Sequence, residues 1–381
     1  VDESSLAGTL ALDRIVACAG EAGAKLVCVG DWAQLSAIEA GGAFGLLARE
    51  RGQDVPELGA ARRFVQEWER HASTRIRVGD ASGVVAYAAY GRIHDGDLVA
   101  VLEGAYQAWS ADESSGQRSL LLAADAETVR SLNARARAER VIHGLVEPEG
   151  TTLRDGLKAG VGDRVVSRLN DRRLAVGTGW VKNGDTWVVT HRCQDGALRV
   201  QRPTGGPSVT MPATYVAQHV ELGYAITAYR AQGATVDSAH AIVAGPGLTR
   251  GVLYVMLTRA REANHVYVST ERAVEPLQGF SDEPVTATSV LRDALARLGD
   301  TASAHETNDA EREAAVAIRT LAAEYETLAH LAQAPRWLGL LSVGGLQPDD
   351  VQRVADSPAF SAFTSALRRA EAHGLPVERA V

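Results

Sequence analysis

KLVCVGDWAQL, residues 25–35, is the stretch of sequence that decides the fold. Its apolar run follows a segment, 6–24, whose apolar residues recur at helical spacing. Continuous apolar runs after a helix are typical of strands in a parallel sheet that is buried on both faces. The polar residues Asp31 and Gln34 come directly after the run, where α/β sheets bind ligands. The stretch therefore predicts an α/β domain with a ligand site at this strand end.

Strand and helix patterns continue outward from this stretch. Val1 stands directly before an acidic pair, and we interpret it as the end of another buried strand. Residues 37–110 are predicted to be mostly helical, and a further helix is predicted at 125–141. Short apolar runs predict more strands, at 119–123, 239–243 and 265–269. Strands that alternate with helices in this way predict a parallel sheet.

Residues 161–220 differ from the rest in charge and in pattern. They hold eight Lys or Arg and four Asp or Glu, a local excess of four positive charges. Short β runs, the last at 207–216, alternate with turn dipeptides such as Asn183-Gly184, and they predict a small antiparallel barrel inserted in the α/β domain. Large aromatic residues of the barrel either stack on unpaired bases or fill its core. These are Trp180, Trp187 and Tyr215.

The last hundred or so residues, 281–381, are predicted to be helical. Asn308 and Glu311 have the spacing of a capping box at the start of a long helix. Residues 301–381 hold seven Lys or Arg and eleven Asp or Glu, so the formal charge of −8 averages a basic insert and an acidic tail. A protein that coats nucleic acid indiscriminately is therefore disfavoured, whereas a local basic channel is allowed.

Length and composition exclude other classes of protein. With 381 residues, 46% of them hydrophobic, the chain can form two or three packed domains, and wholesale disorder is excluded. It contains no apolar run of about 18 residues, so no membrane span is predicted. Three cysteines without a CxxC pair predict no zinc cage. Because the first residue is Val1, we interpret the chain as a piece of a longer protein.

Two polar blocks suit nucleotide hydrolysis. In VDESS, residues 1–5, Asp2 would bind Mg²⁺ and Glu3 would orient or deprotonate an attacking water. In the block that begins at residue 30, Gln34 would hydrogen-bond a terminal phosphate or that water, and Asp31 would anchor the turn. From these residues alone, a solvated helix cap and an ordinary strand-to-helix turn remain as alternatives.

Two further blocks combine apolar segments with cations. GYAITAYRAQGATVD, residues 223–237, places hydroxyl, guanidinium and amide groups on one turn, a mixture that suits phosphate contacts. LYVMLTRARE, residues 253–262, presents Arg259 and Arg261 from an apolar segment, as an arginine that neutralises a transferred phosphoryl group requires. A solvated helix end and a charged helix face are the respective alternatives.

In this order the four blocks resemble motifs II, III, V and VI of superfamily 1 DNA helicases. The resemblance is closest to the helicase part of MobF-type conjugative relaxases, the TraA, TraI and TrwC proteins, with RecD-type helicases next. LGAARRFVQEWER, residues 58–70, looks like motif IV of that family, with Arg63 in register with its arginine. Residues 348–380 resemble the helical region of actinobacterial relaxases, so the likeness spans nearly the whole chain.

The resemblance implies RecA-like parallel-sheet motor domains of the P-loop NTPase class. Residues 1–75 would form the C-terminal part of the first motor domain, and 76–160 together with 221–280 would form the second. Residues 161–220 would be an SH3-like β insert, and 281–381 an all-α C-terminal region.

Roles carried over by this resemblance concern ATP and Mg²⁺ first. Asp2 matches the Mg²⁺ ligand, Glu3 the catalytic carboxylate and Gln34 the γ-phosphate sensor. Arg63 and Arg259 match two arginines that clasp the γ-phosphate. Other matched positions lie beside the nucleotide, namely Asp31, Gln232 and Gly233, or contact DNA, namely Thr227, Tyr229 and Arg230. Tyr229 stands where the family has His, and Trp32 where it has Pro, which puts the coupling to DNA in question.

The implied activity is ATP-dependent translocation on single-stranded DNA and duplex unwinding during conjugative transfer, in the cytoplasm of a bacterium. The resemblance of the helical tail implies that this bacterium is an actinobacterium. The helical tail would contact conjugation or secretion machinery. The 381 residues contain no GxxxxGK[ST] loop to hold phosphates, so we expect the chain alone to hydrolyse little ATP. A stand-alone RecD-like repair helicase and a non-catalytic DNA-binding remnant are the alternatives.

Overall fold

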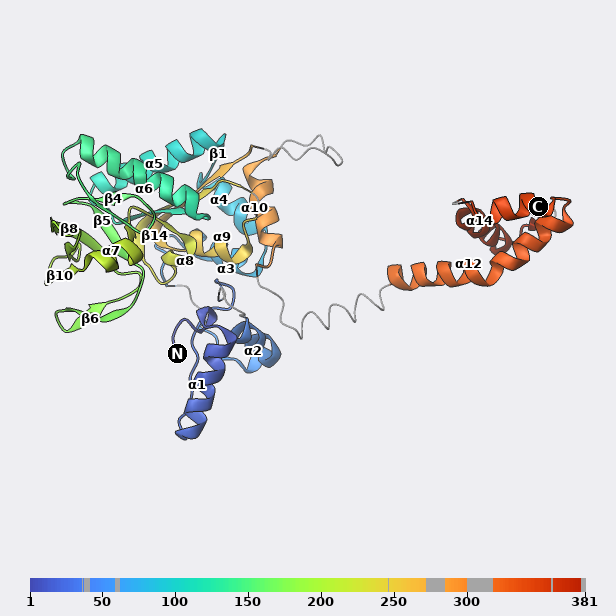
Figure 1. Cartoon of the computed structure of the whole chain (residues 1–381), viewed down its shortest axis with the longest axis horizontal. Coiled ribbons are helices and arrows are strands. Elements are labelled where there is room, and N and C mark those ends of the chain that lie inside the picture. Colours follow the sequence, from blue (N-terminus) through green and yellow to red (C-terminus); the bar gives the residue numbers. More distant parts are fainter. Residues whose placement is uncertain are drawn as a thin grey trace. The chain divides into compact units, whose positions relative to one another are not determined.

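The computed structural model describes residues 1–35, 37, 42–58, 62–245, 247–271, 285–299, 318–357 and 359–377. Two compact units, Val1–Thr301 and Ala302–Val381, make up the chain (Figure 1). The first unit contains two five-stranded sheets, one parallel and one antiparallel, and the described part of the second unit is helical. The predicted α/β class and the predicted all-α C-terminal region are therefore confirmed.

The N-terminal segment carries a short 3-10 helix, η1 (Ser4–Leu6), and two helices, α1 (Thr9–Glu21) and α2 (Ala43–Arg51). Val1 N donates to Val27 O at 2.8 Å, and Val29 N donates to Val1 O at 2.8 Å, the bonding pattern of a parallel pair. Burial on both faces was predicted here and is wrong, since Val27 and Val29 are 56% and 51% exposed. The reason is that no regular strand forms at residues 25–30 and little of the described chain covers them.

A parallel sheet forms the centre of the first unit, and its strand order is β1-β14-β13-β2-β12. Its strands are β1 (Ile93–Gly96), β14 (Ala260–Ser269), β13 (Val236–Val243), β2 (Ser119–Ala123) and β12 (Ala225–Thr227). Every adjacent pair is parallel. Strands predicted at 119–123, 239–243 and 265–269 are confirmed within β2, β13 and β14. Strand β1 was missed because its sequence, IHDG, offers one apolar residue in four and is recruited by pairing with β14.

Helices cover both faces of this sheet (Figure 1). Leu121 and Leu122 of β2 belong to different buried clusters because successive strand residues point to opposite faces. The Leu121 face packs against α5 (Leu98–Ser114) and α6 (Ala126–Ile142). The Leu122 face packs against α3 (Glu67–Val78), α4 (Ser82–Ala89), α8 (Ala228–Ala231), α9 (Arg250–Met256) and α10 (Ala287–Ala296). Asp97 and Asp125 cap α5 and α6, each accepting a backbone N–H at 2.7 Å.

The basic insert contains the antiparallel sheet, with strand order β10-β9-β8-β5-β11. Its strands are β5 (Arg164–Ser167), β8 (Thr186–Arg192), β9 (Leu198–Gln201), β10 (Ser208–Met211) and β11 (Val220–Leu222). Two hairpins flank it, β3 (Thr151–Thr152) with β4 (Lys158–Ala159) and β6 (Asp171–Val176) with β7 (Gly179–Val181). The run predicted as strand at 207–216 is half helix, because Pro212 ends β10 and α7 (Ala213–His219) follows.

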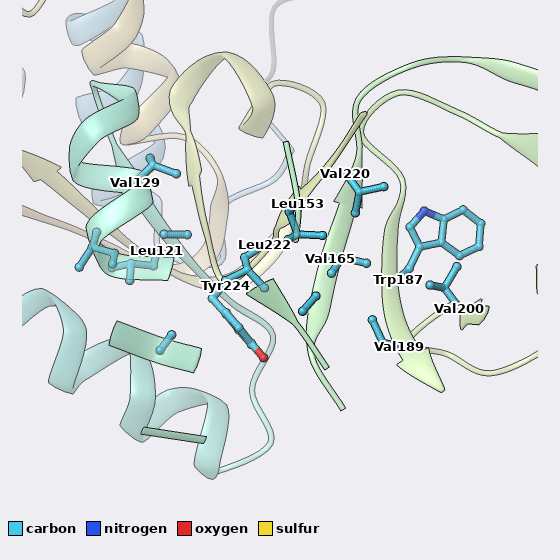
Figure 2. Close-up of a cluster of buried hydrophobic side chains, with 14 of the residues drawn as sticks. Leu121, Val129, Leu153, Val165, Trp187, Val189, Val200, Val220, Leu222 and Tyr224 are labelled. Atoms are coloured by element: carbon cyan, nitrogen blue, oxygen red, sulfur yellow. The ribbon is translucent and has the colours of Figure 1, made fainter. Parts of the chain in front are cut away.

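A single apolar core joins the insert to the parallel sheet. Figure 2 shows Leu222 between Val129 of α6 and Trp187 of β8. Trp187 is fully buried and its Nε1 donates to Ser167 Oγ at 3.1 Å, so the base-stacking alternative for this residue is wrong. Tyr215 is likewise buried. Trp180 is half-buried, with the guanidinium of Arg172 5.0 Å from its ring centroid.

The second unit contains α12 (Ile318–Val343), α13 (Pro348–Ala355) and α14 (Phe360–Ala372). Trp337 of α12 is fully buried, and His330 Nδ1 lies 2.6 Å from Thr364 Oγ1 of α14. Asn308 and Glu311, predicted as a capping box, lie outside the described residues. Among the helices that the structure describes in either unit, none has the length and apolar composition needed to cross a membrane.

Three histidines share one face of the parallel sheet. His94 Nε2 lies 3.0 Å from His265 Nδ1, and His240 Nε2 lies 2.9 Å from an oxygen of Asp112. Arg92 Nη1 lies 2.7 Å from His265 Nε2, and because arginine can only donate, that nitrogen must be unprotonated. Burial, and after it the charge of Arg92, lowers the pKa of His265 to about 3. The folded protein therefore holds this imidazole neutral.

We predict acid destabilisation from His265. Its pKa is depressed on folding from 6.5 to about 3, so the unfolded chain binds the extra proton, and stability falls as the pH drops through this window. This side chain should change the free energy of unfolding by at most about 1.4 kcal/mol per pH unit. The free energy of unfolding, measured with urea at several pH values between pH 7 and pH 4, should therefore fall less steeply with decreasing pH for His265→Gln than for the wild type. The control is His71→Gln, an exposed histidine of α3, and equal slopes for all three proteins would contradict the prediction.

Candidate functional site

Glu3 has a strained backbone and a defined side-chain contact. Its φ of 50° and ψ of 44° lie in the left-handed region, and within the described residues it is the one non-glycine with positive φ. Such conformations cost free energy and cluster at functional sites. Glu3 Oε2 accepts a hydrogen bond from Gln232 Nε2 at 2.9 Å, which brings the first block of the sequence against the third. The neighbouring Asp2 is exposed and accepts from Glu3 N at 3.0 Å.

Gly233 follows Gln232 beside this contact, and its backbone angle, not a lack of space, favours glycine. Its φ of 81° is a conformation that side chains rarely adopt, and a Cβ placed there would lie 4.0 Å from Glu3 Oε1. The other end of the Gln232 amide, Oε1, is buried without a hydrogen-bond partner among the described residues. Buried polar atoms are nearly always satisfied, so this oxygen marks a place for a donor group.

Arg259 and Arg63 concentrate positive charge near Glu3. Arg259 is 1% exposed, and its Nε and Nη2 donate to Val255 O at 2.9 Å and Thr258 Oγ1 at 2.8 Å. Arg63 Nη1 donates to the carbonyl oxygen of Thr258, the residue before Arg259. Burial, and after it the charge of Arg63, lowers the pKa of Arg259 to about 10. Burial also lowers the pKa of Arg63.

These two guanidinium groups have the charge that an anion site requires. In the part of the chain that the structure describes, neither forms an ion pair with a carboxylate, and Glu3 and Asp31 act on Arg259 only through space. Buried charges are costly unless an opposite charge compensates them. Arg261, predicted beside Arg259, instead pairs with Asp237 at the surface.

Asp31 organises the turn of the second block. Its carboxylate accepts from Ala33 N at 3.2 Å and from Gln34 Nε2 at 3.1 Å, so it anchors the turn as predicted from the residues. It also accepts from Arg77 Nε of α3 at 3.0 Å, and the Arg77 guanidinium lies 4.8 Å from the centre of the Trp32 ring. Gln34 Oε1 is buried and has no hydrogen-bond partner within the described chain.

Sequence reasoning missed Arg77. It lies 46 residues from Asp31 inside an amphipathic helix, where an arginine near the C-terminal end has an ordinary helical explanation. Only the packing of α3 against the turn places it there. Together with Gln34, Tyr229 and Arg250, it lines a small cavity of about 60 Å³.

The predicted DNA contacts lie at the end of β12 and in the short helix α8 that follows it. Thr227 ends β12 and stands at the N-terminal boundary of α8, and Tyr229 is 41% exposed. Arg230 is not free, because its Nη1 lies 2.6 Å from Glu221 Oε2 of the insert strand β11. The third block is therefore connected both to Glu3, through Gln232, and to the β insert, through Arg230.

The residues present fit the terminal phosphate of a nucleotide. Two uncompensated arginines suit its charge, and the unpartnered Gln34 and Gln232 oxygens suit a water or hydroxyl donor. No group of three or more metal-ligating side chains is found among the described residues, but Mg²⁺ commonly takes only one or two carboxylates, with phosphates and waters completing its shell. The exposed carboxylate of Asp2 is compatible with that mode of binding.

Comparison with known proteins finds similarity to conjugal transfer proteins. A family model described as an AAA domain matches residues 1–98. "Probable conjugal transfer protein TraA" of Sinorhizobium fredii is 33% identical over 272 residues, which cover 70% of this chain and 24% of that protein. "Conjugal transfer protein TraA" of Rhizobium radiobacter is 34% identical over 279 residues, 71% of this chain and 24% of that protein. The chain thus spans about a quarter of the length of these relatives.

Shorter and more distant similarities were also found. An uncharacterized protein of Mycobacterium tuberculosis is 31% identical over 129 residues, 34% of this chain and 72% of that protein. Among solved structures, a Bacteroides Pif1 helicase in complex with ADP-AlF3 and ssDNA is 17% identical with a TM-score of 0.48, covering 82% of this chain and 73% of that one.

The strain at Glu3 predicts that glycine stabilises the protein more than alanine at this position, the reverse of the usual order in a helix. Glu3→Ala and Glu3→Gly both lose the Gln232 contact, but only glycine relieves the left-handed backbone, so the glycine variant should be more stable by about 1 kcal/mol. At the exposed Glu50 of α2, the order should reverse by about the same amount, because alanine favours helix. Urea unfolding of the four variants checks this prediction. An alanine variant at position 3 that is as stable as the glycine variant would contradict it.

Proposed function

The chain is a homologue of the TraA conjugal transfer proteins, and from this premise we propose that it is the helicase part of a MobF-type conjugative relaxase. It would move along single-stranded DNA, driven by ATP hydrolysis, and unwind duplex during transfer in the bacterial cytoplasm. The ordered blocks, from the Asp-Glu pair to the buried arginine, support a motor of superfamily 1. Its domain boundaries would be those given by the sequence resemblance, with residues 161–220 as the SH3-like insert.

One observation carries the proposal, namely the buried Arg259 and the half-buried Arg63 beside Glu3, neither of which forms an ion pair with a described carboxylate. Arg63 and Arg259 would neutralise charge that develops on a terminal phosphate. Glu3 would orient and deprotonate water, and Gln34 would hydrogen-bond that water through its unpartnered oxygen. Bound ATP with Mg²⁺, held in part by Asp2, would supply the scissile phosphoanhydride.

The contacts around the site also support a physical route from nucleotide to DNA. Gln232 joins Glu3 to the turn that carries Thr227, Tyr229 and Arg230. On the other side, Asp31 joins Gln34 to Arg77 of α3. A rearrangement at Glu3 or Gln34 would therefore act directly on elements packed against the parallel sheet. The acidic helical tail would serve as a contact for conjugation machinery.

ATP hydrolysis tests the proposal. The chain lacks a GxxxxGK[ST] loop, so the test protein carries the preceding segment of a TraA relative joined ahead of Val1. We expect ATPase activity stimulated by single-stranded DNA, while the chain by itself should show little. Glu3→Gln in the joined protein should lower kcat by at least about 100-fold. The matched control, Glu21→Gln at the exposed end of α1, should leave kcat unchanged.

Two results would overturn the proposal. Full activity of the Glu3→Gln protein would remove Glu3 from the reaction and with it the assignment of the first block. If the joined protein folds but neither binds nor hydrolyses ATP, the result would favour a non-catalytic DNA-binding module.

A further inference from the structure

Three arginines surround one carboxylate where the β insert meets the parallel sheet. Glu221 of β11 lies 2.6 Å from Arg230 Nη1, 3.4 Å from Arg154 Nη1 and 3.7 Å from Arg168 Nε. Each arginine comes from a different part of the chain: Arg154 follows β3, Arg168 follows β5 and Arg230 belongs to α8. The cluster therefore exists only in the folded protein.

This arginine cluster, Arg154, Arg168 and Arg230, carries two positive charges more than Glu221 can neutralise. None of the three pairs with another carboxylate among the described residues. The side chains of Arg168 and Arg230 are only 20% and 18% exposed, so solvent screens their repulsion weakly. Burial, and after it the charge of Arg230, lowers the pKa of Arg168.

One atom of the cluster lacks a hydrogen-bond acceptor. Arg168 Nε is buried and makes no hydrogen bond to any described residue; its ion-pair distance of 3.7 Å to Glu221 is too long for one. A guanidinium that is held in place, with unused donors and uncompensated charge, binds oxyanions such as phosphates well. At the other end of the cluster Arg154 is 53% exposed, which leaves a path for a ligand.

The location indicates which anion. Arg230 is next to the exposed Tyr229 on the turn that follows Thr227, the turn proposed above to contact DNA. We infer that Arg154, Arg168 and Arg230 bind the backbone of the single strand and that their two excess charges match two neighbouring phosphodiesters. The strand would thus cross from the motor sheet onto the β insert at this point. The inference rests on the proposed function in that a nucleic acid strand must pass α8.

Salt-dependent DNA binding tests the inference without any need for hydrolysis. Fluorescence anisotropy with a labelled oligo-dT strand measures the affinity of the chain at several salt concentrations. Arg168→Gln should weaken binding roughly tenfold and reduce the slope of log K against log salt by about 0.7, the value for one lost contact to single-stranded DNA. Arg154→Gln should do the same, and Arg168→Lys should recover much of the lost slope because it keeps the charge.

Arg118→Gln is the matched control. Arg118 is 65% exposed and pairs with Asp237, and it precedes β2, at the end of the sheet opposite to Thr227. This variant should leave both affinity and slope unchanged. Circular dichroism and thermal unfolding of each variant separate loss of fold from loss of binding.

The outcomes distinguish this inference from the proposed function. If the wild-type chain binds oligo-dT but folded Arg154→Gln and Arg168→Gln keep its affinity and slope, the cluster is only structural and the inference is overturned. An equal loss for Arg118→Gln would likewise overturn it, because it would show a general charge effect. Absence of oligo-dT binding by the wild type would overturn both the inference and the DNA-translocation proposal.

Discussion

Two residues, Gly223 and Tyr224, carry the chain from the last strand of the antiparallel sheet to the edge strand of the parallel sheet, and the arrangement of the first unit depends on them. Asn133 of α6 forms hydrogen bonds with the backbone at this junction. Its Oδ1 accepts from Tyr224 N and Ala225 N, each at 2.9 Å, and its Nδ2 donates to Ala225 O at 3.1 Å. The Tyr224 hydroxyl donates to the buried carboxylate of Asp163 at 2.7 Å. Because buried polar groups are costly when unpaired, this network holds the junction in one conformation.

The junction fixes the position of the β insert relative to the parallel sheet, and both functional proposals depend on that position. Since the insert shares its apolar core with α5, α6 and the parallel sheet, it cannot turn independently without opening that core. Glu221 lies just before the junction and Thr227 just after it, so the arginine cluster and the polar turn keep a fixed relation. Gln232 then continues the path to Glu3.

Much of the fold could be predicted where local signals were strong. Strand β2 has its predicted bounds because four of the five residues of SLLLA are apolar, and α6 lies within a residue or so of its prediction because its composition favours helix. Long-range packing decided the rest. Strand β1 has no local β pattern, and the Val27 region has the composition of a buried strand but lies exposed.

The candidate site shows the same division. The sequence blocks contain Glu3, Gln34, Arg63 and Arg259, and the folded chain brings Arg63 against the residue before Arg259 and Glu3 against Gln232. Their chemical roles stay predictions. Arg77, Arg154 and Arg168 could not be identified, since each acquires meaning only from a partner far away in sequence, Asp31 or Glu221. A charged residue on a helix or after a strand gives no hint of such a partner.

Hydrogen exchange at the junction tests most directly whether the insert and the parallel sheet form one body. In the intact chain, the amides of Tyr224 and Ala225 should exchange as slowly as those of β2, because both open only when the shared core opens. In Asn133→Ala these two amides should exchange faster than the amides of β2, as their acceptor is lost. The account would be contradicted if, in the wild-type chain, Tyr224 and Ala225 exchanged as fast as the exposed turn between β6 and β7 while β2 remained protected.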